Sequence, residues 1–494
     1  MNIAGLSAWL KENKLIAAAL FIILALRIIF IGAMGLMPQD AYYSFYGEHP
    51  ALSYYDHPPA IAWLLKAFTT LFGKKVFAIK LADTVVTGLT MVCFYRLSLL
   101  FLSRHNTQKA LLLLFPTLMI TILSLVSTPD VPLMLCWALT LICLYKAVFE
   151  ERKIYWIWAG VMMGLAFDSK YTAVFLPFGL LLFLLFSARH RKWLWSPWPW
   201  IGVVMLLLVS SPVIIWNLQH NMASFKFQST GRTGGIEVRP LDFLGVVGHQ
   251  AAILLPVLFF GLLVMLYKTV RKYRLRIAAV PPKKLFLLCF FLPMFLGFFV
   301  ISPIYWVKLN WMMPAYISGI IWVSVYFSYK YIRWQQIVAV IVHLAMAVEL
   351  LFYPVPVNSD DVWMGWGDMA KSVKTLRAQY PDDFLFSADS YKTSAVLNFY
   401  FDEMVYGQNI LEKSALQFDY VGTDLDALAG KNALFINSTP EVGDEKDEKA
   451  FVATLKEYFT EVHPLPPVIC KRGGKVVRKF LVYRCLNYHP DGIE

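Results

Sequence analysis

Hydrophobic and polar residues follow one another in long blocks along the first 353 residues of the chain. A helix needs roughly 20 apolar residues to cross a bilayer, and runs near that length recur between short polar connections. They lie at about 15–36, 77–102, 109–127, 132–149, 155–167, 172–187, 198–216, 243–267, 285–302, 311–328 and 335–353. The pattern predicts a polytopic all-α membrane bundle of about eleven transmembrane helices, with the fifth and sixth runs the shortest.

Residues 354–494 have a different pattern, in which short apolar stretches alternate with polar ones. Helices are expected at "SVKTLRAQY", "YKTSAVLNFYF" and "EKAFVATLKEYF", and strands at "DFLFSAD", "NALFINS" and "KVVRKFLVYRC". The segment "RGGK" at 472–475 is typical of a hairpin turn. The chain is therefore expected to divide into a bundle over residues 1–353 and a small α/β domain over residues 354–494.

Composition supports a membrane protein and argues against a nucleic-acid partner. Of the 494 residues, 58% are hydrophobic and 16% are charged, whereas soluble domains are about half apolar and a quarter charged. The net charge of +12 is unevenly distributed, because residues 1–357 carry 30 Lys and Arg against 12 Asp and Glu, while residues 358–494 carry 15 against 21. The excess of basic residues therefore belongs to the membrane half.

The basic residues gather in alternate connections of the bundle. They include Lys11, Lys14, Arg104, Lys109, Arg152, Lys153, the segment "ARHRK" at 188–192, seven bases between Lys268 and Lys284, Lys330 and Arg333. Cytoplasmic loops of membrane proteins are enriched in Lys and Arg. This predicts a cytoplasmic N-terminus, with the loop 37–76 and the α/β domain outside the cytoplasm.

Cysteine usage is uninformative about chemistry. Cys93, Cys136, Cys143 and Cys289 lie in apolar segments and are expected to pack as small hydrophobic residues. Cys470 and Cys485 lie in the outer domain. They could form a disulfide there, although their spacing alone is a weak signal.

Acidic residues near a membrane are energetically unfavourable and are candidates for function. The acids expected on the outer side are Asp40, Glu48, Asp56, Asp83, Asp130, Asp168, Glu237, Asp242 and Glu349. The outer cations considered with them are Lys170, Lys226, Arg232, Arg239 and Lys308. Cations that hold a lipid phosphate, next to an acid that accepts a proton from an attacking hydroxyl, would suit group transfer from a lipid-phosphate donor.

Simpler interpretations exist for several of these residues. Asp130, in "STPDVPL", could cap the helix that follows it. The Pro58-Pro59 pair could be only a corner, and Arg27, within the first apolar run, could be paired with a neighbouring acid.

Five blocks together resemble a known family. "QDAYYSFYGEHPALSYYDHPPAIAWL" is similar to the first outer loop of GT-C glycosyltransferases of the protein-mannosyltransferase and lipid A aminoarabinose-transferase superfamily. "STPDVPLMLCW", "GLAFDSKYTA", "SPVIIWNLQHNMASFKFQSTGR" and "KLNWMMPAY" resemble further blocks of its bacterial branch, in the same order. The resemblance covers roughly residues 15–320.

The resemblance implies an inverting transferase that uses a polyprenyl-phosphate sugar on the outer side of the bacterial inner membrane. Its acceptor would be a lipid such as lipid A, a glycan or a protein. It implies Asp40 as the catalytic base, with Asp130 and Asp56 supporting the site. Lys170, Arg232, Lys308 and His57 would contact the donor phosphate, and Tyr42, Tyr43, Tyr55 and Asn310 would line the substrate site.

The chain departs from the family pattern at two positions. The commoner pattern has adjacent Asp and Glu where this chain has Gln39 and Asp40, so either Asp40 alone is the base or the catalytic acid has moved by one residue. The aminoarabinose branch has Lys at the position of His57.

Two further expectations concern cofactors and an alternative function. No redox cofactor or obligatory metal is expected, although some relatives in the wider fold use a divalent metal. The alternative function is a lipid or glycan transporter or flippase, which should carry polar residues at mid-depth of the membrane; here they gather at one face.

Overall fold

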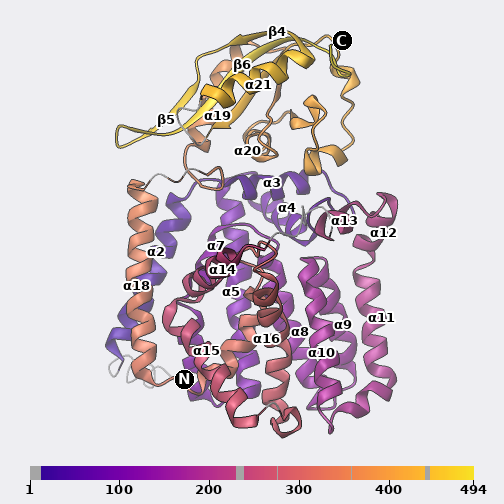
Figure 1. Cartoon of the computed structure of the whole chain (residues 1–494), viewed down its shortest axis with the longest axis vertical. Helices are drawn as coiled ribbons and strands as arrows, with labels where there is room; N and C mark the ends of the chain where they lie inside the picture. The colour runs from indigo at the N-terminus through magenta and orange to yellow at the C-terminus, as the bar shows by residue number, and fades with distance from the viewer. Residues whose placement is uncertain are drawn as a thin grey trace.

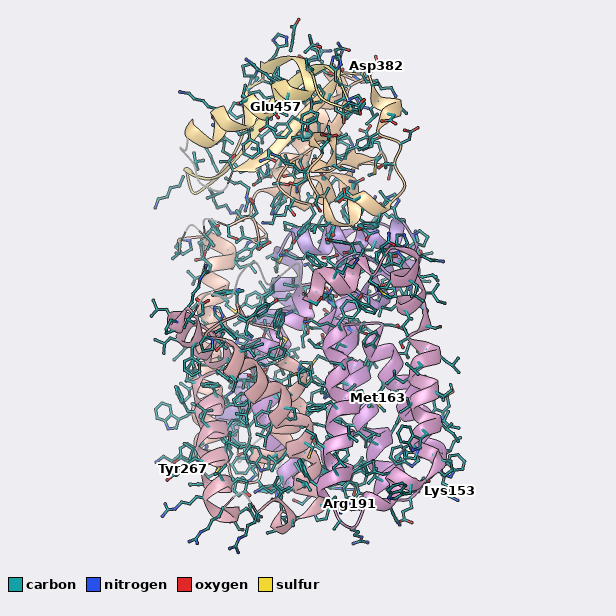
Figure 2. The ribbon with its side chains drawn as sticks, turned by 45° about the vertical axis from the view of Figure 1, so that its right-hand side comes forward. Lys153, Met163, Arg191, Tyr267, Asp382 and Glu457 are labelled. Carbon is teal, nitrogen blue, oxygen red and sulfur yellow. The ribbon has the colours of Figure 1, made fainter. Side chains whose placement is uncertain are left out.

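The computed structural model describes residues 13–229, 238–274, 276–355, 357, 359–439 and 445–493. A bundle of apolar helices forms one part of the molecule, and a smaller domain with a β-sheet covers one end of it (Figure 1). The side chains of both parts are drawn in Figure 2, where Met163 lies within the bundle and Asp382 and Glu457 lie on the domain.

Each predicted apolar run coincides with a helix or with a bent pair of helices. The bundle consists of α2 (Lys14–Ala33), α5 (Val76–Phe101), α6 (Arg104–Leu114), α7 (Leu118–Leu125), α8 (Asp130–Val148), α9 (Ile154–Phe167), η1 (Tyr171–Val174), α10 (Phe175–Phe186), η2 (Arg191–Trp195), α11 (Pro197–Val209), α12 (Ser211–Gln219), α14 (Pro240–Leu254), α15 (Pro256–Tyr273), η3 (Ile277–Ala279), α16 (Pro282–Ile301), α17 (Met313–Ser324) and α18 (Tyr329–Phe352). Within the described residues, 5 helices are long and apolar enough to cross a membrane, or up to 8 if each bent pair is one span. The number eleven stays a prediction.

Three of the runs expected to be single helices are broken. The α6–α7, α11–α12 and α14–α15 pairs bend by 65°, 50° and 114°. Pro116, Pro212 and Pro256 lie at the three breaks. Proline lacks the backbone N–H that continues a helix and clashes with the preceding turn, which accounts for the position of each break.

Helices α9 and α11 pack at close range through glycine. A Cβ atom placed on Gly160 would lie 2.1 Å from the carbonyl oxygen of Gly202, and one on Gly164 would lie 2.6 Å from the Cβ of Val209. Small residues four positions apart on one helix face let two helix backbones approach within a membrane. This contact places α9, and therefore the residues that follow it, firmly against α11.

Three shorter helices lie between the bundle and the domain. They are α3 (Pro38–Glu48), α4 (Ala60–Phe72) and α13 (Ala223–Ser229) (Figure 1). The predicted outer loop 37–76 thus contains two helices, with Pro59 directly before α4. One buried cluster includes Tyr42 and Phe45 from α3 together with Trp366, Leu397 and Phe418 from the domain. The domain is therefore joined to the bundle by a shared core.

The domain contains a mixed six-stranded sheet. Its elements are α19 (Trp366–Gln379), β1 (Phe384–Phe386), α20 (Lys392–Tyr400), β2 (Val405–Tyr406), η4 (Gln408–Leu411), η5 (Leu416–Tyr420), η6 (Asp426–Leu428), β3 (Ala433–Thr439), α21 (Glu445–Tyr458), β4 (Phe459–Pro464), β5 (Val468–Arg472) and β6 (Lys475–Tyr488). The strand order is β2-β1-β3-β6-β4, and β5 also pairs with β6. β1 runs parallel to β2 and β3, whereas β6 is antiparallel to β3, β4 and β5.

The sequence analysis located the three helices of the domain and three of its strands. It missed β2, β4 and β5, and the strand β4 begins at Phe459, the last residue of the helix expected there. The expected hairpin turn at 472–475 joins β5 to β6. Cys470 faces Arg478 across the ladder while Cys485 faces Ala433, so the two cysteines do not pair and are free thiols.

Candidate functional site

The connection between α3 and α4 holds Asp56 at the outer end of the bundle. The Asp56 side chain is buried, with 8% exposed, and its Oδ1 atom accepts hydrogen bonds from the hydroxyls of Tyr42, at 3.3 Å, and Tyr46. Burial, together with the charge of Asp56, raises the pKa of Tyr42 well above its ordinary value. Tyr42 therefore keeps its proton and remains a hydrogen-bond donor to the carboxylate.

A second group of polar residues joins three parts of the chain that are far apart in sequence. Lys170, which follows α9, donates to both carboxylate oxygens of Asp130 at 2.9 and 2.8 Å. Asn310, in the connection before α17, donates to Asp130 Oδ2 at 2.5 Å. Asp130 lies in the first turn of α8, but it does not cap that helix. Its contacts therefore favour a role in holding Lys170 over the simple capping interpretation.

A cavity of about 350 Å³ lies beside these groups and is lined by Lys170 of the second group and by His57, the residue after Asp56. Its other lining residues are Gln228, Ser229, Tyr171 and Thr172, together with Val174, Phe175, Phe298, Ile301, Tyr305 and Trp311. Two predicted phosphate contacts, His57 and Lys170, thus lie on one cavity although 113 positions separate them in sequence.

Gln228 of α13 fixes the loop at this cavity. Its amide group donates to the backbone carbonyl of Asp56 at 2.5 Å, so α13 is joined to the loop next to His57. The ring of Tyr43 lies 5.9 Å from the ring of His57, in an edge-on arrangement. His57 is therefore enclosed by α3, by its own loop and by the cavity wall.

Asp40, the predicted base, lies in a separate buried group. It is fully buried in the first turn of α3, where Oδ1 accepts from the backbone of Ser127 at 2.8 Å and Oδ2 accepts from the backbone of Met37 at 3.0 Å. The ammonium group of Lys80, also fully buried, forms an ion pair with Oδ2. Ser127 in turn donates through its hydroxyl to Asp83 at 2.7 Å. Both oxygens of Asp40 are thus occupied by partners within the fold.

Two of the three predicted substrate-lining tyrosines, Tyr42 and Tyr55, stack on rings of the α/β domain, whereas the ring of Tyr43 contacts those of Tyr42, Tyr46 and His57. The ring of Tyr42 stacks on Tyr391 at 4.2 Å, and the ring of Tyr55 stacks on Tyr420 at 5.1 Å. Gln417 connects the two, since its backbone N–H donates to the Tyr42 hydroxyl and its side-chain oxygen accepts from the Tyr55 backbone. Tyr42 and Tyr55 therefore form the contact between the loop and the domain.

Two predicted phosphate contacts are not brought into this cavity. Arg232 lies outside the described residues, so the structure does not place it. Lys308 is exposed on the connection between α16 and α17, and it is not part of the cavity lining. Asn310, two residues further along, is the part of this block that reaches the site, through Asp130.

Sequence reasoning missed Lys80, Tyr46, Gln228 and Gln417. Lys80 carried a usable signal, because it lies at the outer end of an apolar run and three residues before Asp83, on the same face of a helix. Gln228 and Gln417 carried no such signal, since their partners are backbone atoms of a distant loop.

No metal site is formed by the described residues. Among these residues, His, Cys, Asp and Glu side chains do not gather in groups of three or more that could hold an ion. The acids of the site are instead paired with Lys80, Lys170 and tyrosine hydroxyls. The expectation that the protein needs no metal stays a prediction.

Comparison with known proteins finds a matching family model and similar proteins. Residues 56–216, about a third of the chain, match the model of the dolichyl-phosphate-mannose-protein mannosyltransferase family, and this range contains Asp56, His57, Asp130 and Lys170. A lipid A galacturonosyltransferase of Rhizobium johnstonii is 24% identical over 60% of this chain, and the match spans 61% of that protein. An undecaprenyl phosphate-alpha-4-amino-4-deoxy-L-arabinose arabinosyl transferase of Pseudomonas savastanoi is 29% identical over 24% of this chain and 23% of its own length.

The fold has a full-length counterpart among solved structures. The crystal structure of ArnT from Cupriavidus metallidurans bound to undecaprenyl phosphate superposes with a TM-score of 0.60, covering 96% of this chain and 98% of that one at 14% identity. At this identity the similarity establishes the shared fold, which includes both the bundle and the outer domain. Over residues 56–216 the chain is thus similar to the dolichyl-phosphate-mannose-protein mannosyltransferase family, and over nearly its whole length it shares the fold of ArnT.

Proposed function

We propose that the protein transfers a sugar, with inversion, from a polyprenyl-phosphate donor to a lipid A-like acceptor on the outer face of the bacterial inner membrane. The observation that carries this proposal is a cavity lined by both basic and apolar side chains. His57 and Lys170 lie in the same lining as Phe175, Phe298 and Ile301. A phosphate joined to a long hydrocarbon chain likewise combines a charged and an apolar part.

The location of the cavity suits a lipid substrate. Part of its apolar lining comes from the start of α10, at Phe175, and from the end of α16, at Phe298 and Ile301, and both helices belong to the bundle. A polyprenyl chain could therefore follow the bundle while its phosphate reaches Lys170. Among the relatives, the ArnT of Cupriavidus metallidurans was crystallised with undecaprenyl phosphate, and a donor of this class is proposed for the present chain.

The cations would act mainly on the departing phosphate. In the donor, a phosphodiester carries one negative charge; as the bond between the sugar C1 atom and the phosphate oxygen breaks, the phosphate becomes a monoester with nearly two. Lys170 and a protonated His57 bind the second state more strongly than the first. Only such differential binding accelerates the reaction, and preorganised charges provide it with little rearrangement.

Asp56 is the carboxylate best placed to accept the proton of the attacking hydroxyl. It directly precedes His57, which lines the cavity, and it retains some exposure at 8%. The acceptor oxygen would attack C1 from the face opposite the phosphate, which inverts the configuration, and its proton would move to Asp56. A positioned general base contributes about 10²- to 10⁴-fold to a rate.

The other two predicted acids are better suited to positioning. Asp40 is fully buried and pairs with Lys80, and Asp130 is fully buried and holds Lys170 at 2.8 Å. A base must reach the proton it removes, and both oxygens of Asp40 and of Asp130 accept hydrogen bonds from groups inside the fold. Ser127, which contacts both Asp40 and Asp83, lies three residues before Asp130 and links the two groups.

The transporter alternative has less support. A transporter needs its polar site near mid-depth, usually at paired broken helices. Here Asp56, His57, Asp130 and Lys170 lie at the end of the bundle that carries the domain, and the relatives are named as transferases.

A reconstituted transfer assay tests the proposal. The purified full-length protein in lipid nanodiscs would receive polyprenyl-phosphate-linked galacturonic acid or 4-amino-4-deoxy-arabinose, the two sugars named for the relatives, with lipid A as acceptor. Mass spectrometry should detect one sugar added to lipid A, and the added mass identifies a hexuronic or a pentose donor. Free undecaprenyl phosphate should compete with the donor. Competition without any transfer would contradict the enzymatic proposal, and failure of both would contradict the donor class.

A further inference from the structure

A second cavity lies at the other end of the bundle, between α15 and the connection from α17 to α18. Its volume is about 540 Å³, and it is independent of the proposed transfer site. Lys153, Arg191 and Tyr267 mark this end of the molecule in Figure 2, far from the domain residues Asp382 and Glu457. This is the end that the distribution of basic residues predicts to face the cytoplasm.

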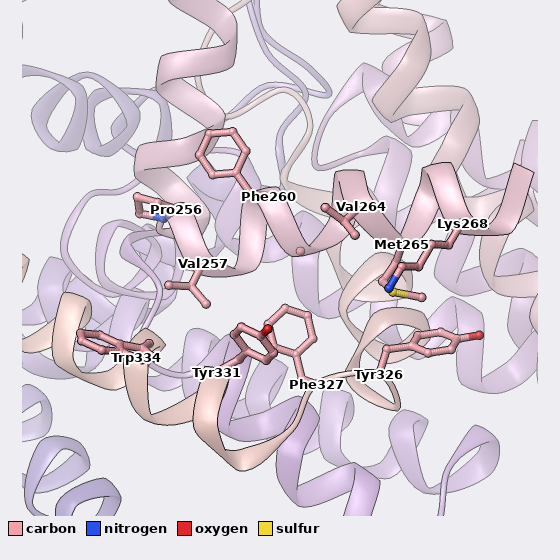
Figure 3. Close-up of a pocket in the computed structure, with 11 residues that line it drawn as sticks. Pro256, Val257, Phe260, Val264, Met265, Lys268, Tyr326, Phe327, Tyr331 and Trp334 are labelled. Carbon is pink, nitrogen blue, oxygen red and sulfur yellow. The ribbon is translucent and has the colours of Figure 1, made fainter. Parts of the chain in front are cut away.

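The cavity has an apolar end and a cationic end. Figure 3 shows Pro256 and Trp334 at one end and Lys268 and Tyr326 at the other, with aromatic and aliphatic side chains between them. The ammonium group of Lys284 donates to the Tyr326 hydroxyl and to Thr269 Oγ1, both at 3.3 Å. A second cation therefore lies beside the polar end, although it does not line the cavity.

The walls of the cavity are held in place by the fold. A Cβ atom on Gly261 would lie 2.3 Å from the ring of Phe327, so glycine is required for α15 to lie this close to the α17–α18 connection. Lys109 Nζ donates to the backbone carbonyl of Phe327 at 2.9 Å and fixes that connection from the other side. The cavity is thus a preformed feature.

Charge indicates what the cavity would bind. Seven Lys and Arg residues lie between Lys268 and Lys284, among them Arg271 and Lys272 in the last turn of α15. The cytoplasmic leaflet contains anionic lipids, and basic pockets between helices on that side bind their headgroups. The aromatic side chains of Tyr331 and Trp334 are about half exposed at the rim, as is typical of residues at the boundary of the hydrocarbon region.

We propose that this cavity binds an acyl chain of an anionic phospholipid of the cytoplasmic leaflet, whose phosphate lies beside Lys268 and Lys284. The apolar part of the cavity, between Lys268 and Trp334, receives the acyl chain, and the two lysines select the headgroup. A bound lipid would stabilise α15 in its orientation relative to α14, which is bent from it by 114°.

Native mass spectrometry of the full-length protein tests this site with two probes, phosphatidylglycerol and phosphatidylethanolamine of identical chains. We expect phosphatidylglycerol to be retained preferentially. Lys268→Gln should lower its retention about fivefold, because one basic residue near an anionic surface contributes about that factor. Arg271→Gln removes the same charge from the same helix but from outside the cavity, and it should leave retention unchanged. Equal losses in both variants, or equal retention of the two lipids, would overturn the proposal.

A photoreactive acyl chain on phosphatidylglycerol locates the site without relying on Lys268. Crosslinks should map to residues 256–265 and 326–334, and Val264→Trp, which fills the cavity, should remove them. Crosslinks spread evenly over the other bundle helices would contradict a specific site. A dimer in the native spectra, lost with Val264→Trp, would instead assign the cavity to a second copy of the chain.

Discussion

Gln417 of the α/β domain is hydrogen-bonded to Tyr42 of the bundle. Its backbone N–H donates to the Tyr42 hydroxyl at 3.2 Å, and that hydroxyl donates to Asp56 at 3.3 Å. The side-chain oxygen of Gln417 also accepts from the backbone N–H of Tyr55 at 2.8 Å. The domain thus holds the loop on both sides of Asp56, through the preceding residue in the chain and through the tyrosine that contacts its carboxylate.

Gln417→Ala should lower kcat about 10-fold while donor affinity changes little. The substitution leaves a half-buried backbone N–H without its acceptor, which costs about 1–3 kcal/mol, and it loosens the loop that places Asp56. Gln408→Ala is the matched control, because Gln408 also binds backbone atoms of the domain, at Ser390 and Ser414, but not the loop. Steady-state kinetics would contradict the positioning role if both variants behaved alike.

Asp56→Asn and Asp40→Asn should fail in different ways. Asp56→Asn should keep its thermal stability and undecaprenyl-phosphate binding but lose transfer by about 10²-fold or more, as expected for a general base. Asp40→Asn leaves Lys80 charged and buried without its partner, which typically destabilises by about 3–5 kcal/mol. Thermal unfolding and transfer assays on both variants separate the roles. A stable, donor-binding and inactive Asp40→Asn protein would return the base role to Asp40, as the family resemblance implies.

Donor affinity should fall as pH rises through the neutral range. Histidine changes charge between about pH 5 and 8, so His57 adds a positive charge to the phosphate site at the lower end and loses it at the higher end. His57→Lys should retain activity and remove this dependence between about pH 6 and 8, because lysine stays charged there. Binding of the polyprenyl-phosphate sugar donor, a phosphodiester that keeps one negative charge across that range, checks the sign. An unchanged pH profile in the variant would remove His57 from the phosphate site.

Gly160→Ala should destabilise the bundle, whereas Gly88→Ala should not. The added methyl group at position 160 would lie 2.1 Å from the Gly202 carbonyl, but at position 88 nothing lies within 4 Å. In an exposed helix position, alanine is favoured over glycine by about 0.5–1 kcal/mol. Thermal unfolding in one detergent should therefore give a lower Tm for the first variant and an equal or higher Tm for the second. A loss of similar size in both would mean that α9 and α11 do not pack through this contact.

The α/β domain should lie outside the cytoplasm. A reporter that is active only in the periplasm, fused after Glu494, should be active in whole cells. The reason is that the basic connections of the bundle lie at the end opposite the domain, and such connections remain in the cytoplasm. A reporter that is active only in the cytoplasm would reverse the predicted orientation of the domain and the site.

The bundle could be predicted from the sequence because long apolar runs have few alternatives in a membrane. The contacts of the site could not, because they join residues far apart in the chain, such as Asp40 with Lys80 and Asp130 with Lys170. Arg27 is a further case, since an acidic partner was expected. It donates instead to the backbone carbonyls of Phe115 and Thr117, at 2.6 and 3.2 Å, which the break between α6 and α7 exposes. The proline at that break is visible in the sequence. The sequence does not show that α2 supplies the side chain, Arg27, that donates to the exposed carbonyls.

The short strands were missed for a local reason. In β4 only Phe459 is buried, and the following residues are mostly exposed, so the apolar alternation that marks a strand is lacking. The strand forms because β6 offers it an extended edge. Pairing of this kind depends on the neighbouring strand, which the local sequence does not describe.

The core shared by α3 and the domain has a consequence for biosynthesis. Tyr42 and Phe45 leave the ribosome more than 300 residues before Trp366, Leu397 and Phe418, against which they pack. Since chains generally fold in the order of their synthesis, α3 cannot complete this core until the C-terminal domain has been synthesised. A chain whose translation stops early would lack the hydrogen bonds of Gln417 to Tyr42 and Tyr55, and the loop around Asp56 would form without them.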